Sequence, residues 1–278
     1  MAAFLNHPNA STSTVSSAAK RLPAIFFGHG SPMNTLDDNR YTQAWARLGS
    51  ETGKPKAILA VSAHWYTRGT AVTAMEKPKT IHDFYGFPQE LYDVEYPASG
   101  DPALANRVQK LLAPLDVGLD QSWGLDHGTW SVLKHAYPNA DVPVVQLSID
   151  ATKPAAFHYE LGSRLAPLRD EGVLIAGSGN VVHNLRMMGR DGGAPYDWTV
   201  RFNDYVRDAI ATQQYERLVA YEEAGEAARL AVPTPEHYLP LLYVLGAQQP
   251  GETAAVSVDG LEIRSISMLS VTVDAPRR

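Results

Sequence analysis

Five of the nine histidines in this chain stand at the ends of apolar segments or beside turn-forming residues. His29 follows an apolar segment within GHGSP, His64 does so within VSAHW, and His183 does so within GSGNVVHN. His127 lies in a Gly-flanked turn, LDHGTW, and His237 at a Pro-bounded helix start, TPEHYLP. Neutral imidazole binds Zn, Fe, Cu and Ni. If these segments meet in space, they predict a metal centre.

The chain has no cysteine, so His, Asp, Glu or backbone oxygen must hold any metal. Two histidines and a carboxylate with open positions opposite are typical of non-haem Fe(II) sites that bind an organic substrate and O₂ together. Three histidines and a water are typical of catalytic zinc. For any single histidine, a structural or surface role is the alternative, and we assign that role to His7, His135 and His158.

The elements that position these histidines alternate in type. Continuous apolar runs bounded by Gly and Pro indicate strands buried on both faces, and amphipathic segments between them indicate helices. The predicted pattern is a single-domain α/β fold with a central mixed, largely parallel sheet and helices on both faces. Ligands of such sheets bind beyond the carboxyl ends of the strands, where His29, His64 and His183 would meet. The predicted strands are 23–27, 57–62, 142–149, 173–176 and 263–273, and the predicted helices are 101–112, 154–168, 197–210 and 237–245.

Composition narrows the class of protein. The formal net charge is −6, which leaves no electrostatic footprint for nucleic acid or an anionic membrane. No apolar run approaches the roughly 20 residues of a transmembrane helix. Residues 1–20, rich in Ala, Ser and Thr, are predicted to form a flexible extension before one domain over 21–278. We expect a cytoplasmic protein, as a monomer or small homo-oligomer.

Two known functional motifs are incomplete in this chain, and one segment has an unusual composition. No Gly follows Ser31 at the spacing of a nucleophile elbow, and Val182 occupies the third Gly position of a dinucleotide fingerprint. The segment 76–100 is dense in aromatics, Gly and Pro, which predicts a long ordered loop. Its members could wall an aromatic-ring pocket or merely pack over the sheet. They are His82, Phe84, Tyr85 and Phe87.

Taken together, the motifs resemble the class III extradiol ring-cleavage dioxygenases, the superfamily of the protocatechuate 4,5-dioxygenase catalytic subunit. Within it, the chain is most similar to the 4,5-DOPA extradiol dioxygenase group. The likeness runs from about Leu22 to Val273 and is specific as an ordered set. The matching pieces are FFGHGSPMN, ILAVSAHW, IHDFYGFPQELYDVEYPASG, GLDHGTW, PVVQLSID, GSGNVVHNL, TPEHYLPLLYVLGA and SMLSV.

The resemblance implies roles for the five histidines. His29 and His64 match two metal ligands, and His237 matches the third ligand of the DOPA-dioxygenase group. His183 matches an acid/base histidine that can also touch the metal in substrate-free proteins, and His127 matches a histidine that contacts the substrate hydroxyl. One departure is that the wider superfamily supplies a Glu as third ligand, whereas this chain reads Glu236–His237. We favour His237, and the choice leaves iron and zinc both open.

Substrate contacts are expected near these histidines. Asp126 and Asn184 are expected to hold imidazole nitrogens, because a ligating histidine usually donates its other N–H. The residues expected to contact substrate are Ser31, Trp65, Tyr85, Asn184 and Tyr238.

The function that the resemblance implies is 4,5-cleavage of L-DOPA or a similar catechol with O₂, giving a muconate semialdehyde. Fe(II) is expected for activity, and Zn(II) is expected to bind readily. The alternatives are a zinc-dependent hydrolase on the same all-histidine site and a non-enzymatic binding protein like the Memo-type signalling proteins. The natural catechol cannot be derived from the residues.

Overall fold

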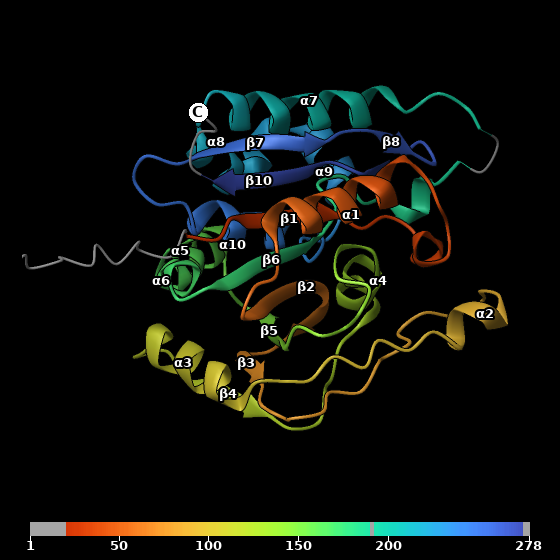
Figure 1. Ribbon diagram of the computed structural model, residues 1–278. Helices are drawn as coiled ribbons and strands as arrows, with labels where there is room; N and C mark the ends of the chain where they lie inside the picture. The colour runs from red at the N-terminus through yellow and green to blue at the C-terminus, as the bar shows by residue number, and fades with distance from the viewer. Residues whose placement is uncertain (1–20, 190–191, 275–278) are drawn as a thin grey trace, which may run out of the picture.

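Eight strands form one mixed sheet through the centre of the protein (Figure 1). The computed structural model describes residues 21–189 and 192–274, so the predicted extension over 1–20 lies outside the described residues. The strands lie in the order β4-β3-β5-β2-β6-β1-β10-β7, and a small separate sheet pairs β8 with β9. The bounds are β1 Ala24–Gly28, β2 Ala57–Thr67, β3 Thr70–Thr73, β4 Val117–Asp120, β5 Val144–Asp150, β6 Val173–Gly179, β7 Thr253–Val258, β8 Leu261–Glu262, β9 Ile266–Ser267 and β10 Ser270–Asp274.

The middle of the sheet is parallel, as predicted. β5, β2, β6 and β1 run in the same direction, each hydrogen-bonded to its neighbour. β10 and β7 extend one side in antiparallel pairing, and β3 joins β5 antiparallel on the other. The predicted α/β class with a mixed, largely parallel sheet is confirmed. Because β2, β6 and β1 are adjacent and parallel, their carboxyl ends meet at one edge.

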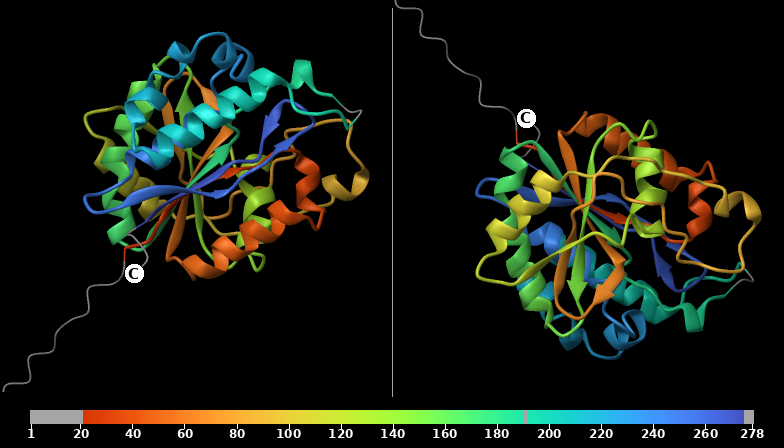
Figure 2. Two further views of the ribbon diagram at one scale, coloured as in Figure 1. Left: turned by 90° about the horizontal axis from the view of Figure 1, so that it is seen from above. Right: turned by 90° about the horizontal axis from the view of Figure 1, so that it is seen from below.

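Helices cover both faces of this sheet, as Figure 2 shows for α1 and α7 on opposite sides. The helices are α1 Arg40–Thr52, α2 Gln89–Tyr92, α3 Pro102–Leu112, α4 His127–Ala136, α5 Ala155–Leu165, α6 Pro167–Asp170, α7 Asp197–Ala211, α8 Tyr215–Val219, α9 Glu226–Ala231 and α10 Leu239–Gly246. Short 3₁₀ turns are η1 Pro32–Thr35, η2 Leu185–Met187 and η3 Tyr221–Ala224.

Each central strand contributes to two hydrophobic cores. In β1, Ala24 and Phe26 join the core beneath α3, α5 and α7 to α10, whereas Ile25 and Phe27 join the core beneath α1 and α4. Successive side chains of a strand point to opposite faces, so both sets must be apolar when both faces are covered. This explains why the strands are continuous apolar runs rather than alternating ones.

Polar side chains fix where the helices begin. The Asp101 side chain accepts from the Leu104 backbone N–H at 2.9 Å and starts α3. Asp126 does the same for the Thr129 N–H at 3.1 Å. Because of this cap, His127 is the first residue of α4, not part of a turn as predicted.

Several predicted elements have different bounds. β2 continues to Thr67 and β6 to Gly179, past the predicted ends at 62 and 176. The predicted strand over 263–273 is divided into β9 and β10. The predicted helix over 154–168 is divided into α5 and α6, with Pro167 at the first position of the second, where proline is tolerated. The last predicted helix begins at Leu239, so His237 precedes it.

Arg169 forms a buried ion pair with Glu252 and also contacts both ends of the described chain. The fully buried Arg169 guanidinium donates to both carboxylate oxygens of Glu252, at 2.6 and 2.8 Å. Its remaining N–H groups donate to the carbonyl oxygens of Leu22, Ala247 and Val273. No helix in the described part of the chain is long and apolar enough to cross a membrane.

Candidate metal centre

The end of β1 and the second half of β2 position the first two histidines. His29 comes directly after β1, and its backbone N–H donates to the carbonyl of Gly179 at the end of β6, at 3.0 Å. His64 lies within β2, in a stretch where the pairing with β5 shifts register between Val61 and Tyr66. An irregularity of this kind redirects side chains locally. His29 and His64 therefore meet as predicted, but the predicted end of the strand before His64 is wrong, because β2 continues through it to Thr67.

His237 reaches the same place from the other end of the chain. The segment before α10 crosses the end of β6, where the Asn180 N–H donates to the His237 carbonyl at 2.8 Å. A Cβ atom on Gly179 would lie only 2.1 Å from that carbonyl oxygen. Glycine at the end of β6 therefore lets the backbone of His237 approach closely enough to place its ring beside the other two.

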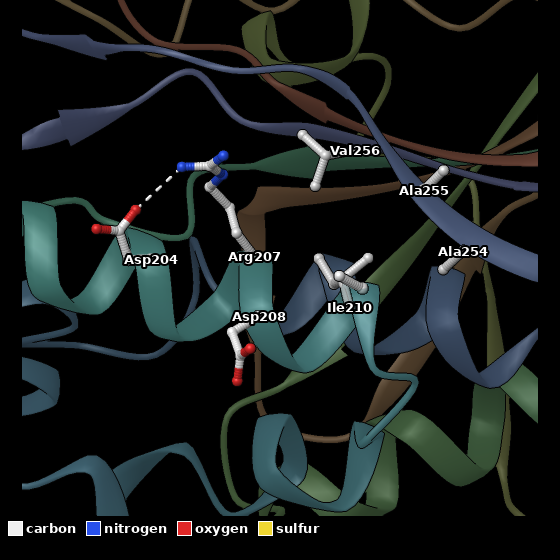
Figure 3. Close-up of a pocket in the computed structure, with 8 residues that line it drawn as sticks. Asp204, Arg207, Asp208, Ile210, Ala254, Ala255 and Val256 are labelled. Atoms are coloured by element: carbon white, nitrogen blue, oxygen red, sulfur yellow. Dashed lines mark hydrogen bonds and ion pairs between the residues drawn. The ribbon is translucent and has the colours of Figure 1, made fainter.

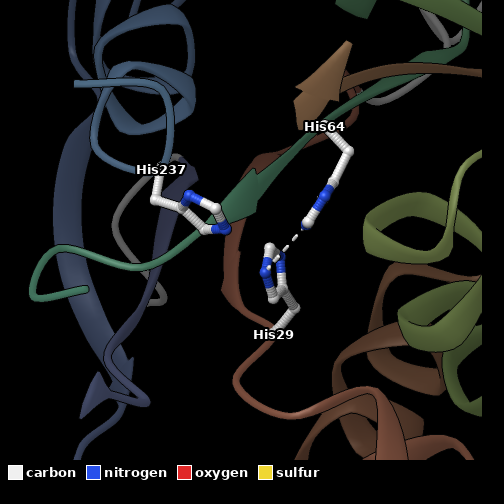
Figure 4. A group of neighbouring side chains, drawn as sticks. All are labelled: His29, His64 and His237. Atoms are coloured by element: carbon white, nitrogen blue, oxygen red, sulfur yellow. Dashed lines mark hydrogen bonds between the residues drawn. The ribbon is translucent and has the colours of Figure 1, made fainter. Parts of the chain in front are cut away.

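The three imidazoles of His29, His64 and His237 form a nearly equilateral triangle (Figure 4). Their ring centroids are 5.2, 5.1 and 5.2 Å apart, and the Nε2 atoms of His29 and His64 are 3.5 Å apart. One nitrogen from each ring lies within 4.8 Å of the others. Nitrogens at this separation can share one metal ion.

Hydrogen bonds determine the tautomer of His29. The Ser178 hydroxyl donates to the Gly128 carbonyl at 2.5 Å, so its oxygen is left to accept from His29 Nδ1, 2.9 Å away. Nδ1 of His29 therefore carries the proton and Nε2 presents its lone pair toward His64. A ligating histidine whose other nitrogen is held in this way is preorganised for a metal.

Glu236 takes a different position from His237. Its carboxylate accepts from the Thr234 hydroxyl at 2.8 Å and lies 3.4 Å from His237 Nδ1. The structure thus brings His237 to His29 and His64, whereas Glu236 lies on the outer side of the His237 ring. Glu236 does group with His183 and His237 in a second set of neighbouring donor atoms.

Two further histidines flank the triangle. The His183 ring stacks on that of His237 with centroids 3.5 Å apart and an interplanar angle of 7°. The His127 ring lies 3.9 Å from that of His64, tilted by 54°. All five histidines singled out in the sequence therefore gather at one point.

Asp83 is a member of the site that the sequence analysis missed. One carboxylate oxygen lies 3.1 Å from His64 Nδ1, and the other lies 3.0 Å from His127 Nδ1. The His127 backbone N–H donates to the same carboxylate at 2.8 Å. One carboxylate thus orients a predicted ligand and a predicted substrate contact. Its only signal in the sequence is its place in the aromatic loop, directly after His82.

Burial keeps most of these imidazoles neutral. Burial and the neighbouring imidazoles lower the pKa of His29 and His237 well below the usual range. Burial also lowers the pKa of His183 to about 3. His64 differs, because its contacts with Asp83 and the nearby Asp126 outweigh burial and raise its pKa.

The contacts of Asp83 with His64 and His127 also shift the pKa of the Asp83 carboxyl group. Burial alone would raise the pKa of Asp83, but His127 and His64 outweigh it and lower this pKa below the ordinary value. Asp83 is therefore ionised at neutral pH. Its negative charge lies beside a cluster in which His29, His183 and His237 are neutral.

The donor set fits a borderline divalent metal. Neutral imidazole nitrogen is a ligand for Zn and Fe alike, and metal binding requires the deprotonated ring. His29 and His237 meet this requirement before any metal arrives. The carboxylate of Asp83 lies 3.1 Å from His64 Nδ1. A histidine that binds a metal through one ring nitrogen usually has a carboxylate or carbonyl partner at the other.

A cavity of about 390 Å³ opens in front of the triangle. All five histidines line it, together with Asp83. The remaining lining is mostly apolar or aromatic, and its members come from four segments of the chain. They are Gly30, Ser31, Pro32, Phe84, Tyr85, Phe87, Leu185, Met188, Ile263 and Ile266.

The predicted substrate contacts divide into two groups. Ser31 and Tyr85 line the cavity, whereas Trp65, Asn184 and Tyr238 do not. Trp65 stacks on Trp123 with centroids 5.5 Å apart, because it points to the opposite side of β2 from His64. The buried Tyr238 hydroxyl donates to the Leu218 carbonyl at 2.9 Å.

Two predicted partners of imidazoles have other roles. The Asn184 side chain donates to the Leu230 carbonyl at 2.7 Å. Asp126 accepts from Ser62 at 2.7 Å and from Gln146, besides capping α4. In the aromatic loop, Phe84 and Phe87 line the cavity, which is one of the two roles left open by the sequence, whereas the His82 ring contacts the Val94 carbonyl at 2.9 Å.

A second, larger hollow lies between α7 and the edge strand β7 (Figure 3). Its charged groups are already paired, since Arg207 contacts Asp204 at 3.0 Å and Asp259 at 3.2 Å, and Asp208 contacts Arg217 at 2.6 Å. Alanine and aliphatic side chains complete its lining. With no group left available for chemistry, this hollow is a weaker candidate than the histidine-lined cavity.

Known proteins show similarity over nearly all of the described chain. The family model described as the catalytic LigB subunit of aromatic ring-opening dioxygenase matches residues 23–271. A protein of Escherichia coli (strain K12) named 4,5-DOPA dioxygenase extradiol is 56% identical over 92% of this chain and 96% of its own length. A protein of the same name from Beta vulgaris is 43% identical over 80% of this chain and 85% of its own length.

A solved structure is also similar. The crystal structure of an uncharacterized protein from Escherichia coli K12 superposes with a TM-score of 0.80 at 52% sequence identity. The match covers 91% of this chain and 99% of that chain. The arrangement of the sheet and helices is therefore one that an experimental structure also shows.

Proposed function

Because this chain belongs to the family of the catalytic LigB subunit of aromatic ring-opening dioxygenases, and is thus an extradiol ring-cleavage oxidoreductase, we propose that it performs 4,5-cleavage of L-DOPA or a similar catechol. O₂ is the second substrate, and both its oxygen atoms enter the product. The product is a ring-opened muconate semialdehyde. No external reductant is needed, since the catechol supplies the electrons.

The observation that supports this proposal most is the convergence of five imidazoles on one cavity with an aromatic wall. Three of them have nitrogens within 4.8 Å of one another. The other two lie beside that group, with Phe84 5.5 Å from the His127 ring. A flat aromatic diol fits between such walls with its hydroxyl groups toward the imidazoles.

We assign His29, His64 and His237 as the ligands of the metal. When bound, Fe(II) templates the catechol and O₂ and passes electron density from one to the other. The same imidazoles suit zinc, which outranks iron in intrinsic affinity. We therefore expect zinc in protein purified without added iron, and activity only with Fe(II).

His183 is assigned as the base. Burial keeps its imidazole neutral at physiological pH, so its ring has a lone pair with which to accept a catechol proton. The negative charge that develops on the catechol beside it offsets the cost of a buried imidazolium. His183 can then return this proton as a general acid later in the reaction.

His127 is assigned as the contact to the substrate hydroxyl. Asp83 lies at its Nδ1, which leaves Nε2 as the nitrogen that faces the cavity. With Nδ1 protonated, Nε2 accepts a hydrogen bond from a catechol hydroxyl. This contact fixes the ring relative to His183, and orientation of reactants is itself a large contribution to rate.

Oxygen consumption tests the proposal. The full chain is reconstituted anaerobically with Fe(II), mixed with L-DOPA and then exposed to O₂. We expect oxygen uptake with a yellow ring-opened product. The zinc-loaded protein is the control and should consume no oxygen, because zinc has no redox chemistry. Absence of uptake with every one of several catechols would contradict the proposed function.

A further inference from the structure

Two buried serines occupy matching positions on neighbouring central strands. Ser62 of β2 and Ser178 of β6 are partners in the register of these parallel strands, so their side chains point to the same face of the sheet. Ala60 and Ala176, two residues earlier in each strand, join the core beneath α1 and α4. Both serine hydroxyls therefore face α4, and because they are buried they need hydrogen-bond partners there.

Each serine hydroxyl donates to the first turn of α4. Ser62 donates to the Asp126 carboxylate at 2.7 Å. Ser178 donates to the Gly128 carbonyl at 2.5 Å. His127, the residue assigned to the substrate hydroxyl, lies between these two acceptors in the chain. The turn that carries His127 is thus held to β2 on one side of this residue and to β6 on the other.

The same two hydroxyl oxygens accept hydrogen bonds from two assigned metal ligands. The Ser178 oxygen accepts from the His29 Nδ1–H at 2.9 Å. The Ser62 oxygen accepts from the His64 backbone N–H at 3.3 Å. This N–H belongs to the stretch of β2 whose pairing with β5 is irregular. Each serine is therefore a link of two hydrogen bonds from a ligand to the first turn of α4.

Glycine at position 128 lets this turn approach the ligands closely. A Cβ atom on Gly128 would lie 2.5 Å from the Ser62 hydroxyl oxygen and 2.7 Å from Cδ2 of the His64 ring. Glycine is unfavourable within a helix, so its presence at the second position of α4 needs a reason. Close contact of the turn with Ser62 and the His64 ring is such a reason.

We propose that Ser62 and Ser178 are positioning residues that hold two metal ligands and His127 at a fixed separation. This inference rests on the ligand assignment of the proposed function and adds two residues to that site. Ser178 acts on the His29 ring, because it keeps the proton at Nδ1 and leaves the Nε2 lone pair for the metal. Ser62 acts on the backbone of His64 and on the cap of α4.

The separation matters because a catechol has to contact the metal and His127 at the same time. Misplacement of a reacting group by about 1 Å can lower a rate by roughly a hundredfold. Two serines that bond both to the ligands and to the turn of His127 prevent such a displacement.

Metal affinity tests the two links without relying on turnover. Competition with a chromophoric chelator measures the affinity of the full chain for Zn(II). Ser178→Ala removes the acceptor for the His29 Nδ1–H, and we expect the affinity to fall by about 10- to 100-fold. Ser62→Ala should lie at the lower end of this range, because Ser62 contacts the backbone of His64 and not its ring.

Ser148→Ala is the matched control. Ser148 is a fully buried serine of the neighbouring strand β5, and its oxygen accepts from the Ala71 backbone N–H at 2.8 Å. The substitution removes the same hydroxyl from the same sheet, away from the histidines. The variant should keep the wild-type affinity for Zn(II).

Proton NMR of the metal-free protein supplies a signature that a loss of stability alone would not change. The His29 Nδ1–H is buried and hydrogen-bonded, so it should give a slowly exchanging imidazole resonance, identified by its absence in His29→Gln. The resonance should persist in Ser148→Ala and disappear in Ser178→Ala. At saturating Fe(II), kcat/KM for L-DOPA should fall by about 10- to 100-fold in both Ser62→Ala and Ser178→Ala.

The outcomes separate this inference from the proposed function. Wild-type Zn(II) affinity in Ser62→Ala or Ser178→Ala, or an equal loss in Ser148→Ala, would overturn the positioning role of the serine concerned. Unchanged kcat/KM in both variants would overturn the link to His127. Absence of oxygen uptake by the wild type, together with the expected losses of Zn(II) affinity, would contradict the proposed function and leave the links to the ligands standing. A wild-type chain that binds no Zn(II) would overturn both.

Discussion

His183 and His237 lie face to face, with ring centroids 3.5 Å apart and planes that differ by 7°. The pKa of each ring is lowered by burial first, so both are neutral and can stack without charge repulsion. The contact joins the residue assigned as base to a residue assigned as ligand. It places the base beside the metal position without requiring His183 to bind the metal.

This arrangement predicts the effect of replacing His183. His183→Ala should lower kcat by about 10²- to 10⁴-fold, the usual contribution of a general base, and should retain its metal. The measurements are oxygen uptake and metal content of the same preparation. His135→Gln is the control, because the His135 ring contacts the Asn34 carbonyl rather than the cluster. Metal lost in parallel with activity would instead identify His183 as a ligand.

The choice between His237 and Glu236 can be tested with two adjacent variants. His237→Ala removes one corner of the imidazole triangle. It should weaken metal binding by more than the roughly hundredfold that loss of a ligand's hydrogen-bond partner costs. Glu236→Gln should leave metal affinity nearly unchanged. Competition with a chromophoric chelator measures both. The reverse order would make the carboxylate the third ligand.

Replacing Asp83 should weaken metal binding and slow turnover together. Asp83→Asn keeps the size of the side chain but removes the negative charge that lies close to Nδ1 of both His64 and His127. A fall of about 10- to 100-fold in metal affinity or kcat/KM is expected, with partial rescue by Asp83→Glu. Asp93→Asn in the same loop is the control, since Asp93 is exposed and its carboxylate accepts a hydrogen bond from the Gln89 side chain. An Asp83→Asn protein that matches wild type in both measurements would exclude the positioning role.

A buried histidine away from the site predicts a pH dependence of stability. Burial lowers the pKa of His158 to about 4 from an ordinary 6.5. Between these values the unfolded chain binds a proton that the folded chain does not, so stability falls as the pH falls through this window. The contribution lost by pH 4 is about 3 kcal/mol.

Urea unfolding between pH 7 and pH 4 measures this effect. His158→Gln should have a shallower loss of stability than wild type over that range. Tyr243→Phe removes the hydroxyl that lies 3.0 Å from His158 Nδ1 but leaves the imidazole buried. It should therefore keep most of the wild-type slope. Identical slopes for wild type and His158→Gln would show that another group controls acid unfolding.

The sequence allowed the convergence of the histidines to be predicted because strand direction follows from simple rules. Apolar runs before His29, His64 and His183 indicate buried parallel strands, and their carboxyl ends share one edge. The short outer strands β3, β4 and β7 were missed. Their mixed polar and apolar residues give no continuous apolar run of the length that the central strands have.

Adjacency in sequence misled the prediction of substrate contacts. Trp65 and Tyr238 each follow a predicted ligand, but the next residue along a strand or turn points elsewhere, and both are buried in the cores. Asp83 was missed for the opposite reason. Its carboxylate reaches His64 and His127 only through the path of the loop over 76–100, and no spacing rule specifies that path.

The three assigned ligands come from distant parts of the chain, at positions 29, 64 and 237. During synthesis on the ribosome, a chain that has emerged only as far as β6 presents two of the three imidazoles and lacks the third. Full affinity for a metal therefore arises only after the segment before α10 has crossed the end of β6.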